Sequence, residues 1–420
     1  PFWLKRSPQA SPVGRRHDMA RASTVFLVCG VFLVCVGCIA TVCLSRSTAL
    51  VSGFRLPPPG QAPPPLTQRP EPKRLVPKVT AVPRQKIAVC ITVTKDGPYL
   101  DGAAVLAQSV LRTGSKYDVE MVAMVHAGVN TTRPMLKRLG FRVIEFEQPI
   151  TSDEIQCDSP AKCHLKNTID KSGCCGTLEL LKLRAYQLHQ YHRVLLLDMD
   201  TVVVKNLDHL IERADDKHSL VFTYDNAMDS GGSRAPPVQG GFLLISPSER
   251  TFQALISIVR SGDFRPGLGW AGSKIGWCWG GQTVQGLLAY YYTMVEPEAG
   301  LAIDPCAYNS MATTDNCSKV AFSDVQSVHF TKCLKPWNCH KARGICAEMH
   351  AFWWKVRQEL QVSHGLPVEE QCCGGCENRH YHDLPIEKLG RIFPALTDYD
   401  FLAHVHQADS RREGLKEQAN

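Results

Sequence analysis

Residues 193–203 have the sequence RVLLLDMDTVV, in which an apolar run precedes two carboxylates separated by one position. The run from Val194 to Leu197 predicts a short buried strand. Ligand sites in open α/β sheets lie beyond the carboxyl ends of the strands, which is where Asp198 and Asp200 stand. Carboxylate oxygens suit a hard cation such as Mg²⁺ or Mn²⁺ better than a soft metal. The stretch therefore predicts a metal-assisted site at a strand end.

Two reaction classes use this pattern, and acids that merely cap the next turn are a third interpretation. In nucleotide-sugar transfer a D-x-D pair holds a metal on the diphosphate. Phosphoryl transfer of the haloacid-dehalogenase type uses D-x-D-x-T, which Asp198, Asp200 and Thr201 also satisfy. Such a phosphatase carries the motif on its first strand, whereas three predicted strands precede it here. Gly262-Asp263 also lacks the second acid of the later metal motif, so the order of elements favours sugar transfer.

Strand and helix patterns alternate from residue 86 onward, which predicts a largely parallel α/β sheet. The expected strands, besides the one before Asp198, are 86–93, 119–125, 142–146, 220–223 and 242–245. The expected helices are 100–112, 132–139, 177–190 and 250–260. We expect residues 148–176, which carry several cysteines, to be an irregular insertion.

The first 85 residues divide into three segments by composition. Residues 25–44 are an uncharged apolar run of about the length that crosses a bilayer, and the more basic tail 1–24 predicts a cytosolic N-terminus. Residues 45–85 are rich in proline and predict an extended stem. Met19 could be the true start, which would leave only Arg21 before the run and make a cleaved signal peptide an alternative. The layout is typical of a single-pass type II Golgi or ER enzyme with a lumenal catalytic domain.

Cysteine usage agrees with a lumenal domain. Of 18 cysteines, four lie in the apolar run, which leaves fourteen elsewhere, many of them clustered. In an oxidising lumen these predict disulfides, although their pairing cannot be deduced from the sequence. A structural zinc is the alternative for one cluster, whose spacing fits no established zinc pattern: Cys372, Cys373, Cys376, His380 and His382.

The C-terminal part and the surface carry further signals. We expect residues 338–420 to form a cysteine-rich, disulfide-tied extension, with Trp353 and Trp354 in a core rather than on a sugar platform. Asn130 and Asn316 begin N-glycosylation acceptor sequences, which matter only in a lumenal domain. The net charge of +7 comes partly from the tail and stem, and no basic helix face with interleaved aromatics indicates nucleic-acid binding.

Four segments together resemble the glycogenin-like family 8 glycosyltransferases, which have the GT-A fold. They are residues 92–103, residues 181–186, the D-x-D motif and residues 328–337, whose HFTKCLKPW segment keeps the family spacing. The resemblance spans residues 87–337. It implies a Rossmann-like mixed sheet flanked by helices in a domain of residues 86–337. It also implies retaining transfer of a hexosyl or related unit from a UDP-sugar to a hydroxyl acceptor on a glycan or protein.

The resemblance also implies roles for particular residues. Thr94 and Tyr99 match the positions that hold the uracil and ribose. His329 would join Asp198 and Asp200 as the third protein ligand to Mn²⁺ or Mg²⁺. Lys335 would pair with the diphosphate, and Lys182 would contact both the donor sugar and the diphosphate.

Two segments depart from the family pattern. Gln239 stands where the family has asparagine, and it still offers an amide to the donor sugar. In residues 280–288 the acid of the family motif is missing, and either Gln282 or Gln285 could take a role there; we assign the catalytic set as Lys182, Gln239 and Gln282. The missing acid leaves one alternative from another class, a lumenal binding protein on a degenerate transferase scaffold.

Overall fold

The computed structural model describes residues 84–214, 217–229, 232–372 and 380–393. All of them belong to one compact unit, Val79–Asn420. The apolar run 25–44 and the proline-rich stem lie outside the described residues. Among the residues described, no helix has both the length and the apolar character needed to span a membrane.

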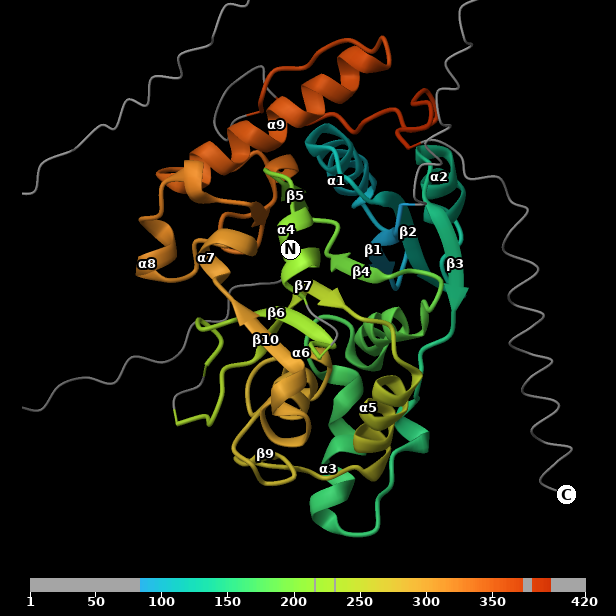
Figure 1. Cartoon of the computed structure of the whole chain (residues 1–420), viewed down its shortest axis with the longest axis vertical. Helices are drawn as coiled ribbons and strands as arrows, with labels where there is room; N and C mark the ends of the chain where they lie inside the picture. Colours follow the sequence, from blue (N-terminus) through green and yellow to red (C-terminus); the bar gives the residue numbers. More distant parts are fainter. Residues whose placement is uncertain (1–83, 215–216, 230–231, 373–379, 394–420) are drawn as a thin grey trace, which may run out of the picture. The chain divides into compact units, whose positions relative to one another are not determined.

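A sheet of seven strands forms the centre of this unit (Figure 1). Its strand order is β10-β6-β7-β4-β1-β2-β3. The bounds are β1 Lys86–Val93, β2 Asp118–His126, β3 Arg142–Phe146, β4 Arg193–Leu197, β6 Leu220–Tyr224, β7 Val238–Ile245 and β10 Gly300–Ile303. All neighbouring strands are parallel except that β7 runs antiparallel to both β4 and β6. The sheet is therefore mixed and largely parallel, as expected, and β7 is the antiparallel strand among those described.

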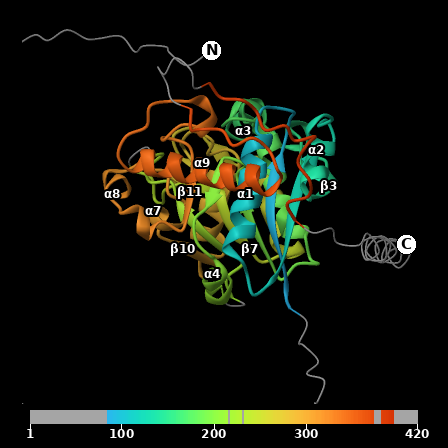
Figure 2. The ribbon, with the colours of Figure 1, turned by 90° about the horizontal axis from the view of Figure 1, so that it is seen from above.

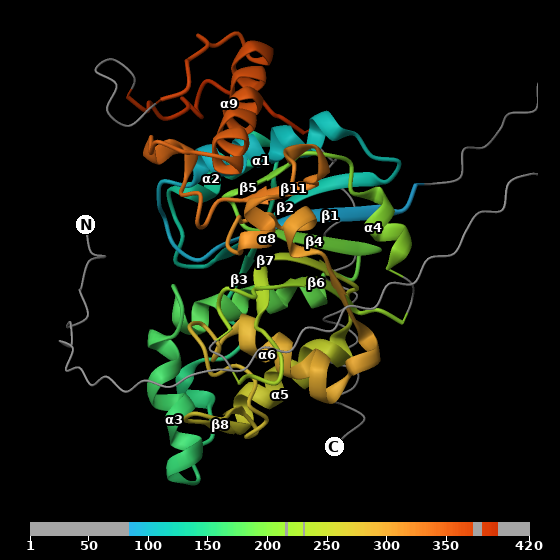
Figure 3. The same ribbon diagram turned by 90° about the vertical axis from the view of Figure 1, so that its left-hand side faces the viewer.

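The sheet is covered on both faces, which explains why its central strands are almost continuously apolar. Along β1, Val89 and Ile91 enter one hydrophobic cluster and Ala88 and Cys90 enter the other. The first cluster is closed by α1 (Leu100–Thr113), α2 (Thr132–Leu139), α4 (Asp208–Arg213) and α9 (Ile345–Ser363). The second is closed by α3 (Pro160–Thr168), α5 (Glu249–Ser261) and α6 (Val284–Tyr290). Figure 3 shows these layers above and below the strands.

Short elements complete the unit. The small strand pairs are β5 (Thr201–Val203) with β11 (Ser327–His329), and β8 (Phe264–Arg265) with β9 (Gly269–Trp270). Two one-turn helices are α7 (Pro305–Tyr308) and α8 (Asp315–Ser318). The 3₁₀ and π turns are η1 Ser152–Glu154, η2 Ile169–Lys171, η3 Gly176–Gln187, η4 Tyr291–Val295, η5 Pro297–Ala299, η6 Phe322–Asp324 and η7 Pro336–Asn338.

Most expected elements lie within one residue of their expected bounds, and three differ more. Strand β7 begins at Val238, four residues before the expected start at Phe242. The segment 148–176 contains a regular helix, α3, which begins with Pro160 at its first position. The expected α-helix 177–190 is the 3₁₀ helix η3. Its buried residues include Leu180, Leu183 and Tyr186, spaced by three, which is the period at which 3₁₀ side chains eclipse.

The cysteines confirm part of the disulfide prediction. The described residues contain four disulfides: Cys157–Cys163, Cys306–Cys317, Cys333–Cys346 and Cys339–Cys372. Cys372 is thus unavailable as a zinc ligand, while Cys373 and Cys376 lie outside the described residues. Trp353 and Trp354 are 0% and 2% exposed on α9, which confirms that they belong to the core. Figure 2 shows α9 beside α1, on which it packs.

Candidate active site

The D-x-D motif lies in a tight turn directly after β4. The Asp198 carbonyl accepts a hydrogen bond from the backbone N–H of Thr201 at 3.0 Å, and the chain continues into β5. Strand β5 pairs antiparallel with β11 in a register that sets Thr201 opposite His329. The N–H of Phe330 donates to the Asp200 carbonyl at 2.9 Å. This pairing brings a histidine from more than a hundred residues away to the two carboxylates.

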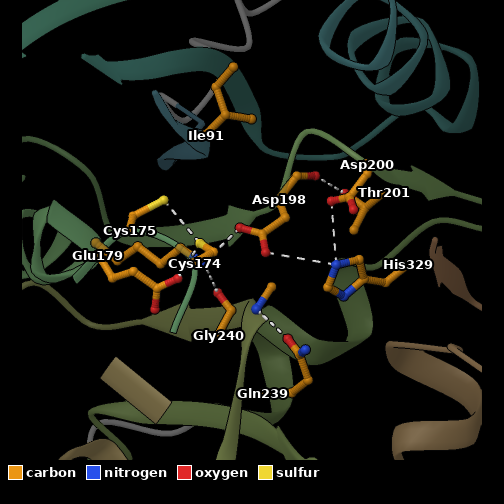
Figure 4. Close-up of polar contacts among 12 residues, drawn as sticks. Ile91, Cys174, Cys175, Glu179, Asp198, Asp200, Thr201, Gln239, Gly240 and His329 are labelled. Atoms are coloured by element: carbon orange, nitrogen blue, oxygen red, sulfur yellow. Dashed lines mark hydrogen bonds and ion pairs between the residues drawn. The ribbon is translucent and has the colours of Figure 1, made fainter. Parts of the chain in front are cut away.

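The three side chains form one cluster (Figure 4). His329 Nε2 lies 3.4 Å from Asp200 Oδ1 and 3.8 Å from Asp198 Oδ2. One ligand atom from each residue lies within 4.8 Å of the others. The His329 side chain is only 4% exposed, whereas that of Asp198 is 28% exposed. The cluster therefore opens to the cavity on the side of Asp198.

A buried asparagine orients the histidine ring. Asn309 Oδ1 lies 3.2 Å from His329 Nδ1, and the Asn309 amide donates to Thr223 Oγ1 at 3.0 Å. If Nδ1 carries the proton, it donates to Asn309, and the lone pair of Nε2 faces the carboxylates. Partners of this kind select the tautomer of metal-binding histidines. No sequence pattern marks Asn309, because it lies in an irregular segment twenty residues before His329.

Two lysines balance the carboxylates. Lys182 Nζ lies 2.7 Å from Asp198 Oδ1 and donates to the Gly240 carbonyl at 3.0 Å. Lys335 Nζ contacts Asp200 and the carbonyl of Phe330. Burial alone would lower the pKa of Lys182, but Asp198 and Glu179 raise it above its usual value. Burial would raise the pKa of Asp200, but His329 and Lys335 hold it well below its usual range.

A cavity of about 620 Å³ contains this cluster. Its wall includes eight of the nine predicted site residues: Thr94, Tyr99, Lys182, Asp198, Asp200, Gln239, His329 and Lys335. Tyr99 packs edge-on against Trp337, with ring centroids 6.2 Å apart. Gln239 Oε1 accepts from the N–H of Gly241 at 2.6 Å. The structure places these residues together, while their individual roles stay predictions.

The ninth predicted residue, Gln282, lies apart from the other eight, and its catalytic role stays a prediction. It does not line the cavity, and its amide donates to Thr168 Oγ1 at 2.8 Å. Gln285 lines the cavity instead, because it lies in the first turn of α6, which packs against β7. Gln282 precedes that helix and turns toward α3. Helix α6 itself starts after Thr283, and its first residue, Val284, is fully buried.

We did not predict Asp225 as a site residue from the sequence. It follows β6, is 5% exposed and lines the cavity, and its Oδ1 has no hydrogen-bond partner among the described residues. Burial raises the pKa of its carboxyl group. Because β6 and β4 run in the same direction beside β7, their carboxyl ends share one edge of the sheet. The sequence did offer one signal for Asp225: it comes just after the predicted strand 220–223, and ligand sites in α/β sheets lie beyond strand ends.

Known proteins resemble this chain over the same region. Residues 90–242 match the model of glycosyl transferase family 8. The putative UDP-glucuronate:xylan alpha-glucuronosyltransferase 5 of Arabidopsis thaliana is 22% identical over 289 residues, covering 66% of this chain. Glycogenin-1 of Oryctolagus cuniculus is 28% identical over 286 residues, covering 63% of this chain and 74% of its own length. The chain spans only 43% of the length of the plant relative.

A solved galactosyltransferase, LgtC in complex with donor and acceptor sugar analogues, shares 13% identity. It has a TM-score of 0.39, with 66% of this chain and 96% of that chain covered. The family model is the stronger finding, because its match includes Lys182, Asp198, Asp200 and Gln239. The chain therefore carries a glycosyltransferase domain, which matches glycosyl transferase family 8 over residues 90–242.

Proposed function

We propose that this protein is a metal-dependent, retaining glycosyltransferase. It would move a hexosyl or related unit from a UDP-sugar to a hydroxyl group of a glycan or protein. One observation carries the proposal: the Asp198, Asp200 and His329 cluster shares a single cavity with Lys182 and Lys335. That arrangement suits a ligand that brings both a cation and a diphosphate.

The donor atoms fit a hard or borderline cation. Two carboxylates and one imidazole nitrogen suit Mn²⁺ or Mg²⁺, and the contact with Asn309 leaves His329 Nε2 directed at the carboxylates. When bound, the cation would supply Lewis-acid stabilisation of the diphosphate charge. Asp198, Asp200 and His329 would hold it.

The lysines would act on the leaving group. Breaking the anomeric C–O bond builds negative charge on the diphosphate, and Lys182 and Lys335 already lie at the cluster, paired with Asp198 and Asp200. Charges fixed before the reaction stabilise such a transition state most effectively. We infer front-face transfer, in which a departing phosphate oxygen takes the proton of the acceptor hydroxyl.

The remaining cavity residues would bind the two ends of the donor. Thr94 and Tyr99, in the loop after β1, would hold the ribose and base. Gln239, Gln285 and the buried Asp225 would face the sugar. Gln285 thus replaces Gln282 in the proposed catalytic set, beside Lys182 and Gln239.

We infer a Golgi or ER location with the domain in the lumen. The four disulfides and the exposed asparagines Asn130 and Asn316 support an oxidising, glycosylating compartment. In this proposal residues 25–44 anchor the chain and residues 45–85 form the stem. The names of the relatives favour UDP-linked sugars and leave the acceptor open among glycans and glycoproteins.

Donor hydrolysis tests the proposal. The full chain, produced in a secretory host, would be incubated with a panel of UDP-sugars with and without Mn²⁺. We expect UDP release from at least one donor, abolished by EDTA and by Asp200→Ala but not by Asp324→Ala, an exposed aspartate outside the cavity. Release from no donor, together with no rise in Tm on adding UDP and Mn²⁺, would refute it and favour a binding scaffold.

A further inference from the structure

A Gly-Cys-Cys-Gly turn forms part of the cavity wall. Gly173 and Gly176 have φ angles of +64° and +59°, and a Cβ on Gly176 would lie 2.4 Å from the Asp170 carbonyl oxygen. Glycine is therefore required at this bend. Side chains of consecutive residues normally point in different directions. Here the turn brings the Sγ atoms of Cys174 and Cys175 to 3.0 Å.

The two thiols differ in their surroundings. Cys174 Sγ donates to Glu179 Oε1 at 2.8 Å, and Thr94 Oγ1 donates to Cys175 Sγ at 3.7 Å. When the single proton of Cys174 points to Cys175 Sγ instead, this hydrogen bond, and more weakly that from Thr94, lowers the pKa of Cys175 to about 6. The contact with Cys175, burial and Glu179 raise the pKa of Cys174. A thiolate therefore stands beside a thiol that has its own proton acceptor.

We propose that Cys174 and Cys175 are a modification site of the donor cavity, where a reversible disulfide forms between neighbouring residues. Both cysteines and Glu179 line the same cavity as the D-x-D motif (Figure 4). Closing the bond requires the sulfur atoms to approach from 3.0 Å to about 2.05 Å. The four disulfides among the described residues indicate that the compartment supplies the oxidant.

The oxidant is a disulfide, carried by a small thiol or by an oxidising enzyme. The Cys175 thiolate attacks one of its sulfur atoms, the S–S bond of the oxidant breaks, and one thiolate leaves. Cys174 then gives its proton to Glu179 and attacks Cys175 Sγ, which releases the second thiolate. Counted from the neutral dithiol, and so including the proton that Cys175 has lost to form its thiolate, the two cysteines lose two electrons and two protons, which convert the oxidant into two thiols. A dithiol reverses the reaction.

The effect on the donor rests on the proposed function. In the reduced state the Cys175 thiolate adds a negative charge to the cavity in which we propose that the diphosphate binds. Lys95, which also lines the cavity, is attracted to that thiolate. Oxidation removes the charge and leaves Lys95 available to phosphate. We therefore expect reduction to weaken UDP binding about fivefold, the size of one partly screened charge.

Peptide mass tests the bond without any activity measurement. The purified full chain would be alkylated without reduction and digested with trypsin, which releases residues 172–182 with no other cysteine. We expect this peptide to be lighter by two hydrogens than the dithiol and to carry no alkyl group. The proposal would be overturned if both cysteines were alkylated even after the protein had been equilibrated with an oxidised thiol buffer. A crosslink to the peptide of Cys278, the free cysteine in a nearby loop, would do the same.

Binding of UDP with Mn²⁺ tests the consequence. The dissociation constant would be measured for the oxidised chain and after mild reduction, with the four other disulfides checked by mass. We expect the Cys174→Ser/Cys175→Ser variant to lose the redox response and to bind like the oxidised chain, and Cys278→Ser to keep the response. Equal affinity in both states would overturn the effect on the donor. If UDP bound neither the oxidised nor the reduced chain, the proposed function would be refuted. The disulfide itself would still be tested by the peptide mass.

A cation offers the competing explanation, because Cys174, Cys175 and Glu179 could also hold a thiophilic metal. Reduced protein would be alkylated after incubation with Zn²⁺, with and without a chelator. Protection by Zn²⁺ in protein that never forms the disulfide would replace our proposal with a metal site.

Discussion

Gly241 lies against two of the proposed metal ligands. A Cβ on this residue would lie 2.4 Å from His329 Cε1 and 2.9 Å from Asp198 Oδ2, closer than side chains approach each other. The neighbouring Gly240 is less constrained, because its Cβ would lie 3.4 Å from Lys182 Nζ. The glycine pair on β7 therefore offers two substitutions of equal size with different consequences.

Gly241→Ala is expected to displace His329 and Asp198 and to weaken Mn²⁺ binding about tenfold to a hundredfold, as loss of ligand orientation does at other metal sites. Titration of UDP release against Mn²⁺ measures this effect. Gly240→Ala should change the Mn²⁺ requirement by less than a factor of three. An equal effect of the two substitutions would show that His329 and Asp198 do not act as ligands.

The low pKa of Cys175 predicts a pH-dependent reactivity of the reduced protein. Because its pKa is lowered to about 6, the reactive thiolate is present above that pH and is lost as the pH falls below it. The alkylation rate of Cys175 should therefore be half-maximal near pH 6 and level above about pH 7. Cys278, whose pKa is raised to about 11 by burial, should stay slow over this range. Matching pH profiles for both would contradict the assigned hydrogen bonds.

The loop between β9 and α6 presents two tryptophans differently. Trp279 is 52% exposed and lines the cavity. Trp277 is 41% exposed but packs on Phe264 and His164, with ring centroids 5.9 Å and 5.8 Å away. The loop is held by a hydrogen bond from Trp270 Nε1 to the Gly281 carbonyl at 2.9 Å. We therefore expect Trp279 to contact the acceptor and Trp277 to support the loop.

Trp279→Ala is expected to raise the acceptor KM about fivefold, because loss of one aromatic contact costs roughly 1 kcal/mol. Donor hydrolysis without acceptor should be unchanged, since the residue does not touch the carboxylate cluster. Trp277→Ala is the matched control, with an unchanged acceptor KM and a lowered Tm. If Trp279→Ala impaired donor hydrolysis and acceptor use equally, the acceptor role would be wrong.

The segment around α9 is joined to the domain by polar as well as apolar contacts. Asp101, buried in the first turn of α1, accepts from the N–H of Leu384 at 2.9 Å and from the hydroxyl of Tyr381. Burial raises the pKa of Asp101. The disulfide Cys333–Cys346 adds a covalent link between the domain and α9. These contacts cross the expected domain boundary at residue 338, which stays a prediction.

Asp101→Ala is expected to lower the free energy of unfolding by about 2–3 kcal/mol, because it leaves the buried N–H of Leu384 and the half-buried hydroxyl of Tyr381 without this acceptor. Urea denaturation of the full chain measures this change. Asp383→Ala removes an exposed carboxylate beside Leu384 and should cost less than about 0.5 kcal/mol. Similar losses for both variants would mean that Asp101 does not hold the segment.

Local sequence patterns were enough to predict the helices and strands of much of the domain. The bounds of β1, α2 and β3 agree with the expected 86–93, 132–139 and 142–146, because a strand buried on both faces and a helix ending at glycine each leave a short-range signal. The D-x-D pair after β4 was visible for the same reason. Resemblance to a family then added His329, Lys182 and Lys335, which no local pattern distinguishes from ordinary polar residues.

Other features depended on contacts between distant segments. Pairing of β5 with β11 brings His329 to Asp200, packing of α6 on β7 selects Gln285 over Gln282, and the Gly-Cys-Cys-Gly turn brings two thiols into the donor cavity. Asn309 and Asp225 join the site in the same way. A short window of sequence records which residues are buried, because burial has a period. It does not record which distant side chains share a cavity, because that depends on how strands and helices from the whole domain pack together.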